Sequence, residues 1–141
     1  MLKPFLAAAL VLACTPAALA ATPCAGADPA LTSAAVKNVT TDGGINHYSI
    51  SGVVTNTGRA RQASNVLQFV DVYRDREKLD NIGIPPLKPG QSYTFSWTFD
   101  RSTEAGDGTT RLHLRLRMTN PPGGSPSQNC NADNDTRVIQ F

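Results

Sequence analysis

An alternating aromatic segment limits more than any other feature how this chain can fold. In residues 93–99, Tyr93, Phe95, Trp97 and Phe99 alternate with Thr and Ser. Side chains two positions apart on a strand point to the same face, so the pattern predicts a strand with four aromatic rings on its buried side. Burial of one large apolar side chain contributes roughly 1.5–3 kcal/mol. This strand is therefore predicted to supply much of the core of a small domain.

A second alternating segment runs from Arg111 to Thr119. Its apolar members are Leu112, Leu114, Leu116 and Met118, and its basic members are Arg111, His113, Arg115 and Arg117. The pattern predicts a strand with one face in the core and one basic face, on which successive cations stand about 7 Å apart.

Five further strands are predicted, over residues 31–40, 45–55, 66–73, 79–84 and 136–141. The turn signals between them include Asp42-Gly43-Gly44, Asn56-Thr57-Gly58, the charged segment 74–78 and Pro85-Pro86. No helical periodicity appears. About seven short strands separated by turns predict an all-β fold, an immunoglobulin-like antiparallel β-sandwich.

The first 20 residues have the pattern of a secretory signal peptide. Lys3 is followed by an apolar run over residues 5–13 and by the small-x-small site Ala18-Leu19-Ala20, which leaves residues 21–141 as a single domain. The apolar run is too short to span a bilayer. The alternative is a lipoprotein box ending at Cys14, which would make the chain a structural or accessory lipoprotein of the bacterial envelope, anchored in the outer membrane.

Charge and cysteine content limit the partners and the compartment. The net charge is +2 over the whole chain and close to zero without the signal peptide, so the charge of the whole molecule favours neither nucleic acid nor a membrane surface as a partner. We expect no nucleic acid partner and no membrane span. In an oxidising compartment we expect Cys24 and Cys130 to form a disulfide that ties the two ends of the domain together, the alternative being two free thiols. Closing a loop of about 100 residues contributes roughly 4–5 kcal/mol.

Three short patterns occur in order at residues 52–58 (Gly-Val-Val-Thr-Asn-Thr-Gly), 87–92 (Leu-Lys-Pro-Gly-Gln-Ser) and 133–135 (Asp-Asn-Asp). Together they resemble the cell-adhesion-related domain of bacteria, known as CARDB, over residues 27–141. The resemblance implies an immunoglobulin-like sandwich in a secreted, periplasmic or surface protein. It also implies contact with a protein or a cell-surface glycan, and no catalysis.

The candidate binding face consists of Phe69, Tyr73, Arg111, His113, Arg115 and Arg117. The alternation that buries Val70 and Val72 turns Phe69 and Tyr73 outward, and a ladder of cations suits sulfate, phosphate or an acidic partner. The alternative is a solvated face, in which the arginines pair with acids such as Asp71 and residues 79–84 cover the aromatic rings.

Metal binding and catalysis have weaker signals. Asn131, Asp133 and Asp135 alternate like calcium ligands, but Asn134 and Asp135 are equally suited to capping backbone groups before the last strand, as Asn56 is in its own turn. The only histidines, His47 and His113, have no metal-ligand spacing, and no Ser, His and acid motif is present. We therefore expect no cofactor and no enzymatic activity; a small hydrolase is the remote alternative.

Overall fold

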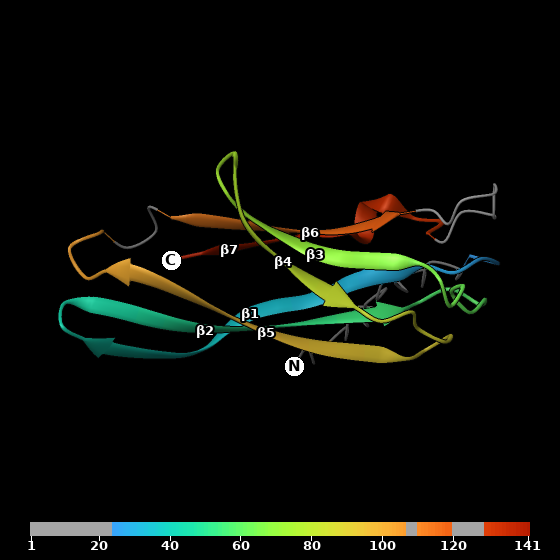
Figure 1. Cartoon of the computed structure of the whole chain (residues 1–141), viewed down its shortest axis with the longest axis horizontal. Coiled ribbons are helices and arrows are strands. Elements are labelled where there is room, and N and C mark those ends of the chain that lie inside the picture. The colour runs from blue at the N-terminus through green and yellow to red at the C-terminus, as the bar shows by residue number, and fades with distance from the viewer. Residues whose placement is uncertain (1–23, 107–109, 120–128) are drawn as a thin grey trace, which may run out of the picture.

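Seven strands form two antiparallel sheets that pack face to face (Figure 1), which confirms the predicted β-sandwich. The computed structural model describes residues 24–106, 110–119 and 129–141. The predicted signal peptide and Cys14 lie outside the described residues.

One sheet has three strands in the order β1-β2-β5, and the other has four in the order β4-β3-β6-β7. The strands are β1 (Pro29–Asp42), β2 (Ile45–Asn56), β3 (Leu67–Arg74), β4 (Glu77–Ile84), β5 (Ser92–Ser102), β6 (Arg111–Thr119) and β7 (Thr136–Gln140), and a short 3-10 turn, η1 (Ala132–Asn134), precedes β7. Within the described ranges, no helix has the length and hydropathy that a membrane span needs.

The first hairpin forms at the predicted turn. Gly43 and Gly44 adopt φ values of 53° and 79°, which glycine tolerates without strain. Strand β1 is longer than predicted and pairs with β2 up to the turn, with register shifts between Leu31 and Ser33 and again near Lys37. Such bulges interrupt the free edge of β1, which makes it a poor template for pairing with another chain.

The core lies between the inward faces of the two sheets. Leu112, Leu114 and Leu116 are fully buried, as the alternation in β6 predicts. Phe95 and Phe99 from β5 pack into the same cluster.

The prediction of four buried rings on β5 is wrong for two of them. Tyr93 is 37% exposed and Trp97 is half-buried, because β5 is an edge strand whose outer side the second sheet does not fully cover. The indole Nε1 of Trp97 donates to Asp80 Oδ2 on β4 at 2.9 Å. This bond connects the edges of the two sheets.

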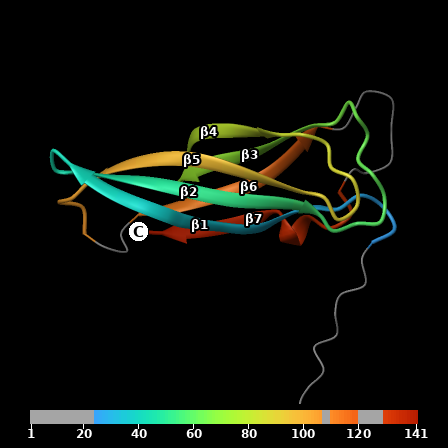
Figure 2. The same cartoon turned by 90° about the horizontal axis from the view of Figure 1, so that it is seen from below.

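The two ends of the domain are joined as predicted. Cys24 and Cys130 form a disulfide with a Cα–Cα distance of 6.4 Å, and the Cys130 amide donates to the Ala27 carbonyl at 3.1 Å. Although β1 and β7 belong to different sheets, they lie along the same side of the sandwich (Figure 2), where Arg137 Nη2 donates to the Thr32 carbonyl at 3.4 Å.

A buried amide organises the end of the sandwich near the disulfide. Asn56 is completely buried. Its Nδ2 donates to the carbonyls of Ala60 and Leu87 at 2.9 and 3.0 Å, and its Oδ1 accepts from the amides of Asp28 and Gly58 at 3.0 and 3.1 Å. Asn56 is thus a turn-former bonded to the backbone, in agreement with the prediction from its turn.

Gly52 gives a test of this packing. It lies opposite Phe95 in the β2–β5 register, and a Cβ at this position would overlap the Phe95 ring. We expect Gly52→Ala to lower the free energy of unfolding by about 1–3 kcal/mol, because the ring must leave its place in the core. Urea unfolding measures this. Gly83→Ala is the control, since a Cβ there meets nothing within 4 Å; equal loss in both variants would contradict the packing argument.

Candidate functional site

The outer face of the four-stranded sheet holds all six residues of the predicted binding face. Across β3 and β6 the register pairs Phe69 with Arg117, Asp71 with Arg115, and Tyr73 with His113. Arg111 is the first residue of β6 and pairs with Gln140 of β7. Strand β4 pairs beside β3 as the edge of the sheet and does not lie over it. The alternative that residues 79–84 cover the aromatic rings is therefore wrong.

Asp71 is buried on this outward face, with 1% of its surface exposed. Lys78 Nζ and Arg117 Nε lie 2.8 Å from its two carboxylate oxygens. Burial alone would raise the pKa of Asp71, but the hydrogen bonds and charges of Arg117 and Lys78 outweigh burial and lower it. The same contact raises the pKa of Arg117.

The guanidinium of Arg117 is thus engaged by other residues of the same chain. Its guanidinium carbon also stands 5.0 Å from the centre of the Phe69 ring, a cation–π geometry. The prediction that an arginine of this face pairs with Asp71 is confirmed for Arg117. Because each engages the other, Phe69 and Arg117 are less available to a partner than the sequence suggested.

Arg111 and Arg115 differ from Arg117. Both are exposed, and no carboxylate oxygen of the residues that the structure describes lies within ion-pairing distance of either guanidinium. They are the cations of this face that a ligand can reach without breaking an internal ion pair.

A shallow groove of about 370 Å³ crosses β3, β6 and β7 beside Arg115. Tyr73, His113 and Val138 form one rung of its floor, since His113 pairs with Tyr73 on one side and with Val138 on the other. Val138 is 55% exposed, unusually high for a valine on a strand. Val138 is absent from the predicted binding face, although its alternation with buried Ile139 indicates an outward side chain.

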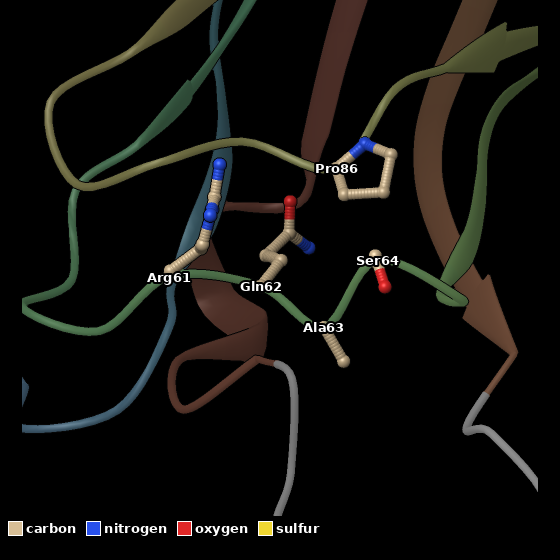
Figure 3. A pocket seen from close by; sticks show the side chains of 5 residues that line it. All are labelled: Arg61, Gln62, Ala63, Ser64 and Pro86. Carbon is tan, nitrogen blue, oxygen red and sulfur yellow. The ribbon is translucent and has the colours of Figure 1, made fainter.

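A larger opening of about 470 Å³ lies in the loop between β2 and β3 (Figure 3). Its most buried polar side chain, Gln62, is 2% exposed. Gln62 Oε1 accepts from the Leu87 amide at 2.9 Å, and its amide forms reciprocal 3.0 Å bonds with that of Gln68. The buried polar side chain of this opening therefore has a structural role, which is to hold the loop in place. We assign the candidate site to the smaller groove beside Arg115, where cations and aromatic rings lie together.

The calcium candidates lie around η1. Asn131 Oδ1 accepts from the Asp133 amide at 3.1 Å and caps the 3-10 turn. Asp135 Oδ2 accepts from Asn129 Nδ2 at 2.8 Å, and Asp133 is exposed. The cap is therefore made by Asn131, and the prediction that the Asn134 and Asp135 side chains cap backbone groups is wrong: Asn134 Nδ2 donates to Asp28 Oδ2 at 3.1 Å, and Asp135 bonds to the Asn129 side chain.

Asp135 is 8% exposed, and its Oδ1 is buried without a hydrogen-bond partner in the described structure. The pKa of Asp135 is raised to about 6, chiefly by burial and also by the charge of Asp28, whereas the Asn129 hydrogen bond and the charge of Arg115 oppose the rise. The carboxylate form of Asp135 is therefore unfavourable in the folded state.

No protein-family model matches this chain, and a search of curated proteins finds no match. The function is therefore argued from the fold and from the chemistry of the outer face.

Replacing Asp71 tests the buried ion pair. Asp71→Asn leaves Lys78 and Arg117 without a counter-charge, so we expect a loss of about 1–3 kcal/mol in the free energy of unfolding at neutral pH. Because the folded pKa of Asp71 is lowered, the loss should shrink as pH falls through that pKa. Glu77→Gln is the control: it breaks an exposed pair with Arg74 and should cost less than about 1 kcal/mol.

Replacing Asp135 should raise the free energy of unfolding at neutral pH, whereas replacing Asp71 should lower it. With a folded pKa near 6, Asp135 keeps a proton that the unfolded chain loses, so its contribution to stability disappears as pH rises from about 4 to 6. Asp135→Asn removes this penalty and should stabilise by up to about 3 kcal/mol at neutral pH, with little gain near pH 4. Thermal unfolding across this range measures the difference; a gain independent of pH would contradict it.

Proposed function

We propose that this chain is an exported, non-catalytic bacterial binding domain that contacts an anionic partner through the outer face of its four-stranded sheet. The observation that carries the proposal is the excess of cations on that face. On the described residues of this face, Lys78, Arg111, Arg115 and Arg117 stand beside the carboxylate of Asp71, and Asp75 borders the groove from the β3–β4 turn. The two carboxylates of β4 are engaged elsewhere: Glu77 pairs with Arg74, and Asp80 accepts from Trp97 of the other sheet. Two of these cations, Arg111 and Arg115, are exposed.

The groove is suited to contact with a large partner. Tyr73, His113 and Val138 provide an apolar and aromatic floor next to the Arg115 guanidinium. Tyr and Arg are enriched at the centres of protein interfaces, where a ring supplies contact area and a guanidinium supplies directed hydrogen bonds. A sulfated or carboxylated glycan and an acidic protein surface share the anionic group that this arrangement recognises.

Export is supported by the Cys24–Cys130 disulfide, because disulfides persist in oxidising compartments. The proposed relationship to the CARDB family is supported by the seven-stranded sandwich and by two of its turns. Asn56 is the buried centre of one turn, and Gly90 adopts a φ of 72° in the Pro-Gly turn before β5.

Charge reversal tests the binding face. The double variant Arg111→Glu/Arg115→Glu should reduce binding to immobilised dextran sulfate or polyglutamate about tenfold or more, because both exposed cations become repulsive. The control Lys37→Glu/Lys88→Glu makes the same change in net charge at exposed positions outside this face. Surface plasmon resonance at fixed ionic strength compares them. Equal loss in both variants, or no binding by the unmodified chain, would contradict the proposal.

A further inference from the structure

A second group of ligand-type side chains lies outside the basic face, where the N-terminal segment meets the loop before β7. One ligand atom from each of Cys24, Asp28 and Cys130 lies within 4.8 Å of the other two. In the oxidised chain the two sulfurs are bonded to each other. Asp28 precedes β1 and is 5% exposed, so a buried carboxylate stands next to the disulfide.

Three hydrogen bonds fix the Asp28 carboxylate in this position. Its Oδ2 accepts from Thr57 Oγ1 at 2.6 Å and from Asn134 Nδ2 at 3.1 Å, and its Oδ1 accepts from the Asn131 amide at 3.1 Å. Metal-ligating carboxylates are oriented in the same way by donors from outside the coordination sphere. The carboxylate is thus pre-positioned beside the sulfurs, whatever their oxidation state.

Reduction of the disulfide changes the charge balance of this cluster. Two thiolates beside the buried Asp28 carboxylate would add negative charge at a place where Asp28 already raises the pKa of Asp135. A divalent cation relieves that repulsion. Two sulfurs and one carboxylate oxygen form a donor set that zinc accepts, with water completing four-coordination.

We propose that the reduced chain binds one Zn²⁺ through Cys24, Asp28 and Cys130. The disulfide in the oxidised chain and the metal in the reduced chain would then be alternative links between the same two segments. A dithiol reductant transfers two electrons and two protons to the disulfide and becomes a disulfide itself. Zn²⁺ then forms bonds to both sulfurs and to an Asp28 oxygen, and the two thiol protons pass to solvent. Cys130 is exposed, so a reductant can reach the bond.

The metal would join the same two segments that the disulfide joins. In the oxidised chain these segments are held by the covalent bond and by the hydrogen bond from Cys130 to Ala27. Zinc bound in the reduced chain would keep the lead-in to β1 attached to the lead-in to β7, so the fold would survive reduction in the presence of zinc.

Cobalt serves as the spectroscopic probe. The full chain is reduced with a water-soluble phosphine: the disulfide accepts two electrons from the phosphine, and water supplies the oxygen of the phosphine oxide and the two thiol protons. The reduced chain is then titrated with Co²⁺ without oxygen. We expect a thiolate-to-cobalt charge-transfer band and the intense visible bands of tetrahedral cobalt, saturating at one ion per chain and displaced by Zn²⁺. The oxidised chain should show neither band. Absence of both bands from the reduced chain would overturn the proposal.

Variants distinguish a metal site formed by all three residues from Co²⁺ binding by the two thiols alone. Cys130→Ser should abolish the tetrahedral spectrum, Asp28→Asn should weaken Co²⁺ binding at least about tenfold, and Thr57→Val should weaken it by about 10-fold. Asp133→Asn, which changes an exposed carboxylate in the same segment, is the control and should bind normally. Circular dichroism of each oxidised variant checks its fold.

A second measurement tests whether Co²⁺ binding by the reduced chain depends on its folded structure. In concentrated urea the thiols remain but Asp28 is no longer held beside them, so the affinity for Co²⁺ should fall at least about tenfold. Equal affinity in urea and in buffer, or equal affinity of Asp28→Asn and the unmodified chain, would overturn the proposed site.

Discussion

The Asn56 amide is the interaction on which the end of the sandwich near the disulfide depends. The Asn56 side chain forms four hydrogen bonds with backbone groups. These bonds connect the residues before β1, the turn after β2 and the segment that enters β5. A buried amide without partners would cost about 1–3 kcal/mol. Since these segments are far apart in sequence, the amide forms all its bonds only when the ends of the three strands β1, β2 and β5 have come together.

Two buried carboxylates show how neighbours decide the effect of a buried charge. Asp71 and Asp135 are almost equally inaccessible to solvent. Asp71 has a lysine and an arginine at 2.8 Å, which lower its pKa, whereas Asp135 faces burial and the charge of Asp28, which raise its pKa. Burial penalises both carboxylates, and only a directly bonded cation reverses the sign.

The same contrast shapes the proposed binding face. Asp71 neutralises Arg117 and leaves Arg115, which is its direct neighbour in the register, free of an ion pair among the described residues. The basic residues that look equivalent in the sequence therefore have two roles: Arg117 stabilises the sheet, and Arg111 and Arg115 remain for a partner.

The sequence by itself determined the fold class, the face of each central strand and the cysteine pairing. The alternation in β6 and the glycines of the β1–β2 hairpin act through local geometry, which a period of two and a positive φ express directly. The tertiary structure alone decided that Tyr93 and Trp97 lie at an edge, that Arg117 is the partner of Asp71, and that Asp28 stands beside the disulfide. These depend on which strands become neighbours and which become edges, and on contacts between residues about 50 to 100 positions apart, which no local pattern records.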